Sequence, residues 1–306
     1  MLQLTSVTVA VCTFRRNDQL LTLLTKLIEL VSGPLGDLQL GIVVVDDDPS
    51  GGAEAVVRDL AAEGGGMLRY RHAGSANLST ARNTAIEEGL RSGEWLVFID
   101  DDCLPHDEWL RHLLDVQERT SADMVTGHVV YRAKDEAPSW LVDEPFLDFT
   151  AYEDGNEPDF GTTANVLLST RFLRDSGVRF RPTLGLTGGE DMTFYADARA
   201  AGANLRYSAK AIVYEPLTPS RERLRYHLHR QFWLGNNMVV INRHTHRESM
   251  VRLLVRGTKR AIVPVPQAAV RICRGQPAQF RWALAYALQG VGLVLGVLGV
   301  TVRHRP

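Results

Sequence analysis

The sequence contains few cysteines, and none of them has the spacing of a structural site. Among its 306 residues are three, Cys12, Cys103 and Cys273, which lie far apart and form no paired zinc motif. The sequence therefore excludes a disulfide-rich scaffold and a structural zinc site as the basis of the fold. A reducing compartment is expected.

Several catalytic signatures are also missing. No serine stands in a glycine-flanked elbow, and no cysteine lies in a catalytic pattern with histidine, so nucleophilic hydrolysis has no support. No phosphate-binding P-loop is present, which argues against nucleotide hydrolysis as the primary chemistry. The N-terminal stretch MLQLTSVTVAVCTF lacks a basic start, and its alternating valines predict a strand, not a signal peptide.

Acidic residues are almost absent from the last part of the chain. From Arg221 onward there are 15 Lys and Arg against 2 Asp and Glu, which leaves 19 against 34 in the first 220 residues. The net charge of −2 thus hides an acidic body with a basic tail. Such a tail suits nucleic acid, anionic lipid headgroups or a diphosphate.

The composition, 45% hydrophobic and 23% charged, is that of an ordinary globular protein. In the first 130 residues, short apolar runs at 7–11, 41–45 and 95–99 alternate with helical patterns at 18–31, 52–63 and 76–91. This alternation predicts an α/β fold with a mostly parallel sheet flanked by helices.

The three predicted strands end in polar residues: CTFRR, DDDPS and DDDC. Ligands of open α/β sheets bind outside the carboxyl ends of the strands, so Thr13, Asp46 and Asp100 to Asp102 should converge on one site. Adjacent carboxylates about 4 Å apart repel by about 4 kcal/mol at an effective dielectric of 20. Either water screens them or a cation binds there, although Asp101 also suits a simple turn or cap.

Seven motifs follow one another in an order typical of one family. They are VTVAVCTFRRNDQL, IVVVDDDPSGG, NLSTARNTAIEEG, WLVFIDDDC, PSW, TANVLLS and GGEDMTF. With them the chain resembles, over roughly residues 5–240, the inverting family 2 glycosyltransferases of GT-A fold. The likeness is strongest to bacterial exopolysaccharide enzymes of the succinoglycan type, which add glucose to a lipid-linked oligosaccharide. The resemblance implies the Rossmann-like GT-A fold of nucleotide-diphosphosugar transferases.

The resemblance also implies roles for donor-binding residues. Asp102 and Asp100 match the DxD positions, where Mn²⁺ or Mg²⁺ bridges to the donor diphosphate, and hard divalent ions do favour carboxylate and phosphate oxygens. The other implied nucleotide-sugar-binding residues are Thr13, Arg15, Asp46, Arg82, Asp101 and Arg230. The nearby His227 and His229 could supply charge or a metal ligand, but histidines at i and i+2 do not share a helical face.

Asp191 matches the family's catalytic base, preceded by Glu190. In an inverting transfer, one carboxylate takes the proton of the acceptor hydroxyl, which predicts a β-linked product from an α-linked donor. Without the resemblance, the two acids would be explained by a helix N-terminal charge preference. Trp140 could stack on the acceptor sugar or be an ordinary core aromatic.

The expected reaction is a single sugar addition, because the QxxRW signature of processive synthases is absent: Gln231 is followed by Phe232, Trp233 and Leu234. The resemblance implies a UDP-hexose donor, a glycan or polyprenyl-diphosphate-linked acceptor, and no nucleic acid. Two rivals are a nucleotidyltransferase, although CTFRRND lacks the usual glycines, and a non-catalytic, membrane-bound subunit. The oligomeric state is not predicted.

The expected organisation is a catalytic domain at 1–240 and a helical tail at 241–306. The resemblance divides the former into a nucleotide-sugar-binding half (1–131) and an acceptor-binding half (132–240). In the tail, a basic amphipathic stretch precedes 20 residues without formal charge, 283–302, which as a helix would be about 30 Å long. This helix could span a membrane, lie on it or be a buried core helix. The expected location is the cytoplasmic face of the cell membrane.

Overall fold

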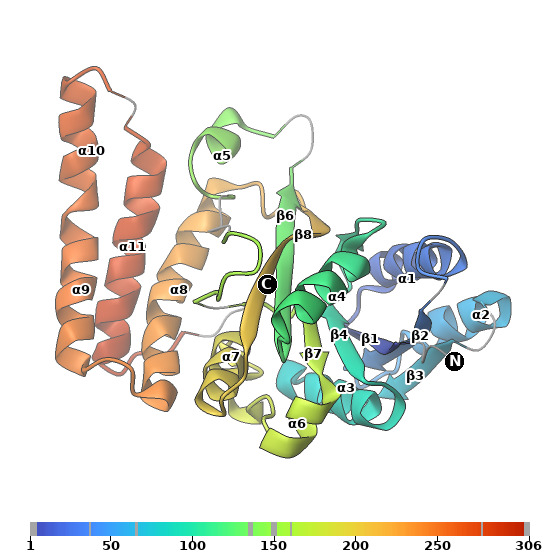
Figure 1. The fold of residues 1–306 in the computed structure, drawn as a ribbon. Coiled ribbons are helices and arrows are strands. Elements are labelled where there is room, and N and C mark those ends of the chain that lie inside the picture. The colour runs from blue at the N-terminus through green and yellow to red at the C-terminus, as the bar shows by residue number, and fades with distance from the viewer. Residues whose placement is uncertain are drawn as a thin grey trace. The chain divides into compact units, whose positions relative to one another are not determined.

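Apolar runs near the N-terminus form the centre of a sheet in the computed structural model (Figure 1). The structure describes residues 5–36, 38–64, 67–133, 137–147, 152–159, 161–276 and 278–302. The chain divides into two compact units, which are described separately. Unit 1 comprises Met1–Val130, Ala151–Gly185 and Glu190–Glu215, and unit 2 comprises Tyr131–Thr150, Leu186–Gly189 and Pro216–Pro306.

Eight strands within the described residues form one sheet, in the order β3-β2-β1-β4-β7-β6-β8-β5. Their bounds are β1 Ser6–Thr13, β2 Gln39–Asp46, β3 Leu68–His72, β4 Trp95–Ile99, β5 Leu104–Pro105, β6 Met124–Arg132, β7 Asn165–Ser169 and β8 Leu205–Pro216. Pairing is parallel from β3 through β2 and β1 to β4. Beyond β4 it is antiparallel between β4 and β7, β6 and β7, and β5 and β8.

Helices cover both faces of this sheet. The first core cluster joins the sheet to α1 (Asn17–Ser32), α2 (Glu54–Gly64) and α4 (Trp109–Thr120). The second joins it to α3 (Leu78–Ser92), α6 (Thr170–Ser176) and α7 (Glu190–Ala200), and the short 3-10 helix η1 spans Pro182–Leu184. Val7, Val9 and Val11 face the first cluster while Ala10 faces the second, because alternate strand residues point to opposite faces.

The α/β fold class is confirmed, and the strands and helices expected in the first 100 residues are present. Strands β3, β5 and β8 were not predicted. LRYRH and LRYSAKAIVYEP interrupt their apolar residues with charges, and β5 has only two residues. From β3 at one edge, the chain crosses back to β4 on the far side of β1. This reversal creates the switch point at which such sheets bind ligands, beyond the ends of β1 and β4.

Unit 2 consists mainly of helices: α5 (Ser139–Asp143), α8 (Leu224–Thr245), α9 (Met250–Ile262), α10 (Pro264–Cys273) and α11 (Phe280–Val297). Among the described residues, α11 is the one helix long and apolar enough to cross a membrane, and 44% of it is buried inside the protein. It ends at Val297, and residues 303–306, including Arg303 and Arg305, lie outside the described residues. The functional divisions expected at residues 131 and 240 stay predictions, and residue 240 falls within α8.

Glycines let α11 approach its neighbours closely. A Cβ at Gly292 would overlap the carbonyl oxygen of Phe232 on α8, and one at Gly290 would overlap the backbone nitrogen of Ala261 on α9. Gly296 packs against Val239 of α8. The small-xxx-small spacing of Gly292 and Gly296 therefore serves helix packing inside unit 2.

We expect Gly292→Ala to destabilise the protein by up to about 2 kcal/mol, because α8 and α11 must move apart to admit the methyl group at a cost of about 1–3 kcal/mol. This cost opposes the gain of about 1 kcal/mol that alanine brings to a helix interior. Urea unfolding measures the difference, with Val291→Ala on the exposed side of the same helix as control. A variant more stable than the wild type would contradict the packing described here.

Candidate functional site

The carboxyl ends of β1, β2 and β4 meet in unit 1. Thr13, the last residue of β1, is the register partner of Asp46, the last residue of β2. The Thr13 hydroxyl donates to Asp101 Oδ2 just beyond β4, at 2.8 Å. The side chains that the sequence placed at strand ends thus lie together, as the parallel topology requires.

Arg16 provides positive charge to two of the three aspartates that follow β4. Its Nη1 donates to Asp101 Oδ1 and to Asp102 Oδ2, both at 3.0 Å. Burial raises the pKa of Asp101, while Arg16 and the Thr13 hydroxyl favour its charged form. Sequence reasoning named Arg15 and missed Arg16, whose position at the start of α1 was its one available signal.

Arg82 is a second cation, 4% exposed, and it joins three carboxylates. Its Nη1 donates to Glu190 Oε1 at 2.8 Å and to Asp191 Oδ1 at 2.6 Å, and its Nη2 lies 3.7 Å from Asp100 Oδ1. Burial alone would lower the Arg82 pKa, but the charges of Asp191, Glu190 and Asp100 outweigh it and raise the pKa. Arg82 is therefore a buried ion-pair centre, not a solvated helix arginine.

Burial and crowding disfavour charge on two of these partners. Burial, followed by the neighbouring charge of Asp191, raises the pKa of Glu190, while Arg82 opposes the rise. Burial likewise raises the pKa of Asp100 to about 8, with Arg82 opposing and the adjacent aspartates contributing. The pair at the start of α7 thus faces a specific cation and does more than complement a helix dipole.

Thr163, which is fully buried, fixes the carboxylate of Asp191. Its hydroxyl donates to Asp191 Oδ1 and Oδ2, at 3.0 and 3.1 Å, and its backbone N–H donates to Oδ2 at 3.2 Å. The Asp191 side chain is 22% exposed and so remains open to solvent on one side. Thr163 is the first residue of the motif TANVLLS, and its type and position there predict no contact with Asp191.

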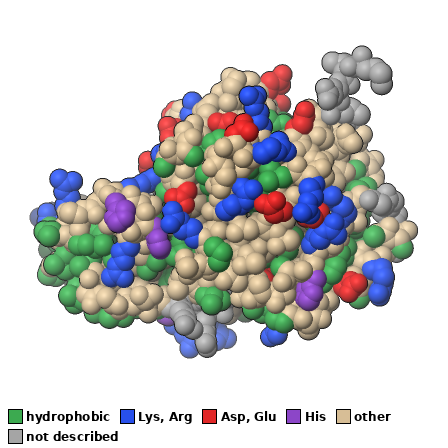
Figure 2. Space-filling view, turned by 90° about the horizontal axis from the view of Figure 1, so that it is seen from below, with side chains coloured by type: hydrophobic (Ala, Val, Ile, Leu, Met, Phe, Trp, Pro, Cys, Tyr) green, Lys and Arg blue, Asp and Glu red, His purple; other side chains and the backbone are tan. Residues whose placement is uncertain are grey.

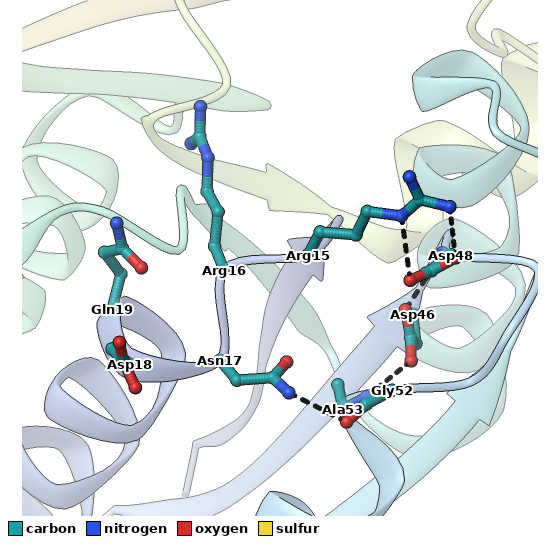
Figure 3. Close-up of a pocket in the computed structure, with 9 residues that line it drawn as sticks. All are labelled: Arg15, Arg16, Asn17, Asp18, Gln19, Asp46, Asp48, Gly52 and Ala53. Atoms are coloured by element: carbon teal, nitrogen blue, oxygen red, sulfur yellow. Dashed lines mark hydrogen bonds and ion pairs between the residues drawn. The ribbon is translucent and has the colours of Figure 1, made fainter.

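A pocket of about 330 Å³ lies beyond β1 and β2 (Figure 3). It lies against the first residues of α1, at Asn17 and Asp18, and against Gly52 and Ala53, which lead into α2. Helix N-termini carry partial positive charge and unpaired N–H groups, which favour anions. The volume is in the range of small-ligand pockets.

Two aspartates shape this pocket. Asp46, 1% exposed, accepts from the backbone nitrogens of Asp48 and Ala53 and from the Tyr70 hydroxyl, at 2.9, 2.9 and 3.1 Å. Arg15 reaches across to Asp48, with Nε 3.1 Å from Oδ2, and lowers the Asp48 pKa to about 2. Asp46 thus holds the loop after β2, and its expected contact with the nucleotide sugar stays a prediction.

The donor set suits a divalent cation that is shared with a ligand. Five carboxyl groups, at residues 100–102, 190 and 191, face only two guanidinium groups, those of Arg16 and Arg82. A bound cation would favour the ionised forms of Asp100 and Glu190, whose pKa values are raised. The described residues hold no cluster of three or more side chains able to bind a metal by themselves. Mg²⁺ and similar ions are commonly held by one or two carboxylates plus phosphate oxygens, so Asp100 and Asp102 fit this role.

Trp140 and Arg230 belong to unit 2. Trp140 on α5 packs edge-on against Phe146 and His227, with ring centroids 5.3 and 5.8 Å apart. Arg230 is partly buried on α8. Their contacts with acceptor and donor stay predictions.

His227 is 3% exposed, and its Nε2 lies 2.7 Å from the Arg221 carbonyl oxygen, so its surroundings are those of a core residue.

Comparisons with known proteins agree with this geometry. Residues 8–178 match the family model described as "Glycosyl transferase family 2". The chain is 29% identical to the succinoglycan biosynthesis protein ExoM of Rhizobium meliloti, over 95% of this chain and 93% of ExoM.

Two solved structures show the same fold. The mannosyltransferase PcManGT from Pyrobaculum calidifontis, in complex with GDP-Man and Mn²⁺, matches with a TM-score of 0.64 and 16% identity, over 97% of this chain and 88% of that one. S. aureus TarS 1–349 in complex with UDP-GlcNAc matches with a TM-score of 0.52 and 14% identity, over 95% and 91%. The chain spans 54% of the longer TarS chain.

We expect Thr163→Val to lower kcat about tenfold with little change in KM, because one donor to the Asp191 carboxylate is lost while shape is kept. Thr163→Ser keeps the hydroxyl and should restore kcat, and Thr22→Val on the exposed surface of α1 is the matched control. A kcat unchanged in Thr163→Val would reduce Thr163 to a packing residue.

His227 should make stability depend on pH. Burial lowers its pKa from 6.5 to about 4, so between these values the unfolded chain binds a proton that the folded protein excludes. Stability should therefore fall as pH drops through this window, by up to about 3 kcal/mol. His227→Gln keeps a donor for the Arg221 carbonyl group and should lose this dependence in urea titrations. Exposed His229→Gln should keep it, and equal slopes in both variants would refute the assignment.

Proposed function

Because the chain belongs to glycosyl transferase family 2, we propose that it moves a single hexose from a nucleotide diphosphate sugar to an acceptor hydroxyl with inversion. The donor is a UDP-hexose. The acceptor is a lipid-linked oligosaccharide in the synthesis of a polysaccharide or cell-envelope glycan.

The carboxylate of Asp191 carries the proposal. Two donors of Thr163 and the guanidinium of Arg82 fix its orientation, while one side stays open to solvent. A carboxylate held in this way can accept the proton of a sugar hydroxyl as the hydroxyl oxygen attacks the anomeric carbon. Attack opposite the leaving diphosphate gives the inverted, β-linked product from an α-linked donor.

The donor occupies the strand ends of unit 1. The nucleotide lies along the pocket beyond β1 and β2, next to Thr13, Arg15 and Asp46, where the first turns of α1 and α2 favour its phosphates. Asp100 and Asp102 hold Mn²⁺ or Mg²⁺ together with the diphosphate. The bound ion supplies charge neutralisation at the leaving group, so no protein acid is needed there. The Mn²⁺ and sugar nucleotides bound by PcManGT and TarS support this assignment.

The acceptor assignment is supported by the likeness to ExoM, which is named for succinoglycan biosynthesis. Aromatic Trp140 contributes a face to the acceptor sugar, and Arg230 adds charge at the diphosphate. The apolar helix α11 and the basic tail support a location at the cytoplasmic face of the membrane.

Asp191→Asn should abolish transfer, by at least about 10³-fold, while donor binding stays near wild type, because the amide keeps its size but accepts no proton. Asp102→Ala should lose the metal-dependent part of donor binding. Both are measured with sugar nucleotides and Mn²⁺, as a thermal shift for binding and as product formation for transfer, since a ligand that binds the folded state raises Tm. Asp175→Asn, on exposed α6, is the matched control.

The outcomes separate the rival functions. Full turnover by Asp191→Asn would remove it as the base. Absence of any metal-dependent shift with every sugar nucleotide would favour a non-catalytic subunit. Release of pyrophosphate from a nucleoside triphosphate and a sugar phosphate would indicate a nucleotidyltransferase.

A further inference from the structure

The exposed hydrophobic side chains of this protein are concentrated in one part of unit 2. Of the 17 large hydrophobic residues that are exposed in the described chain, 13 fall between Met250 and Val300. Figure 2 shows hydrophobic side chains gathered at the left end of the molecule, on the side where α9 lies in Figure 1. Scattered exposed leucines and valines need no explanation, but a contiguous group marks an interaction surface.

Helix α9 presents two different apolar sides. Leu253 and Gly257 are buried, and Gly257 packs against Leu293 and Val294 of α11. On another side, Val251, Leu254, Val255, Thr258 and Ile262 recur at helical spacing and are exposed. Spacings of i, i+3, i+4, i+7 and i+11 put them on one face, so α9 has more apolar surface than α11 covers.

The same spacing continues into α10, which follows α9 nearly end to end in Figure 1. Ala269 and Ile272 lie seven and ten residues beyond Ile262, and both are exposed. We call the set Val251, Leu254, Val255, Ile262, Ala269 and Ile272 the α9–α10 face. Together α9 and α10 would be about 36 Å long at 1.5 Å per residue, but they carry five Lys and Arg, which suit the membrane interface and not the hydrocarbon core.

Basic side chains border this face. On α9, the exposed side chains of Arg252 and Lys259 lie beside the apolar residues, along one edge of the face. Arg271 is exposed on α10, and Arg274 is exposed directly after the end of α10. Acidic residues after Arg221 are limited to Glu222 and Glu248, and Glu248 pairs with Arg256 at 2.6 Å. An exposed apolar stripe with a basic border is complementary to an anionic lipid surface, where chains and headgroups meet.

The contacts of α11 argue against a spanning orientation. Its Gln289 donates to Gln231 of α8 at 2.9 Å and accepts from Arg260 of α9 at 2.8 Å. Asn236 of α8 donates to the Gly292 carbonyl group at 3.2 Å. Crossing a bilayer would either strip α11 of these partners or carry charged and amide groups into hydrocarbon, both costly.

We propose that the α9–α10 face docks on an anionic bilayer, with α9 and α10 lying in the headgroup region and no described helix crossing the membrane. The inference rests on the membrane location proposed above and names its surface, lipid class and orientation. It concerns residues of α9 and α10 in unit 2, whereas Asp191 and the strand-end aspartates that carry the proposed chemistry belong to unit 1.

The test is flotation of the purified full chain with vesicles. One set contains equal parts of phosphatidylcholine and phosphatidylglycerol, and the other contains phosphatidylcholine alone. The double variant Val251→Asp with Val255→Asp changes side chains that are 70% and 50% exposed, so folding should persist. The matched control, Leu21→Asp with Val142→Asp, adds the same charge at exposed hydrophobic residues elsewhere, 45% and 67% exposed.

The wild type and the control should float with the anionic vesicles and bind only weakly to vesicles of phosphatidylcholine alone. High salt should release both proteins from the anionic vesicles. The face variant should bind at least tenfold more weakly. Arg252→Gln with Lys259→Gln should weaken anionic binding about 30-fold, since each basic side chain at such a surface contributes about a factor of five.

Three results would overturn the proposal. Unchanged flotation of the face variant would remove this surface from membrane binding. Resistance of the wild type to both high salt and alkaline carbonate would indicate a spanning helix. A dimer lost in the face variant, without vesicle binding by the wild type, would make a second copy the occupant.

Donor binding separates this proposal from the proposed function. The face variant should keep the wild-type thermal shift with sugar nucleotide and Mn²⁺. If the wild type showed no such shift but still floated with the anionic vesicles, the transferase assignment would be refuted and the docking proposal would not be affected.

Discussion

The buried guanidinium of Arg82 is the interaction on which the arrangement of the strand ends in unit 1 depends. A charge at 4% exposure costs several kcal/mol unless ionised partners surround it. Here the partners come from the end of β4 and the start of α7, and they repel one another. Each charge is tolerated because of the others, so one side chain on α3 fixes the relative positions of three elements.

A second, smaller set of hydrogen bonds and ion pairs holds the other side of the same carboxylate cluster. Thr13 and Arg16 come from the end of β1 and the start of α1, and they hold Asp101 and Asp102. The sheet topology makes both sets of contacts possible, since the reversal between β1 and β4 brings these segments to one edge. The cluster still holds more carboxyl groups than guanidinium groups, which gives a cationic ligand an electrostatic reason to bind there.

Sequence reasoning succeeded where local patterns decide the structure. The apolar runs gave β1, β2 and β4, and parallel topology then brought Thr13, Asp46 and the aspartates after Ile99 together. It failed where a contact joins distant residues of ordinary type. Arg82 and Asp191 are 109 positions apart and Thr163 and Asp191 are 28 apart, and no spacing rule connects them. The resemblance singled out Arg82 and Asp191, but their pairing with each other needed the structure.

For residues 283–302, hydropathy could not distinguish a spanning helix from a packed one. The glycine contacts that show packing depend on α8 and α9, which hydropathy does not report.

The packing of α11 also bears on the order in which the protein acquires its structure during synthesis. Every segment of unit 1 precedes Pro216, whereas unit 2 gathers two short early segments around the helices α8 to α11, which follow unit 1 in the chain. At about 5–20 residues per second, translation of residues 216–306 takes roughly 5–18 s. Throughout that time α8 and then α9 emerge while the surfaces that α11 will cover are still exposed. All of unit 1 is translated before α8, whereas these surfaces of unit 2 stay uncovered until α11 is translated, so those seconds are the period in which a chaperone or a nearby membrane can bind them.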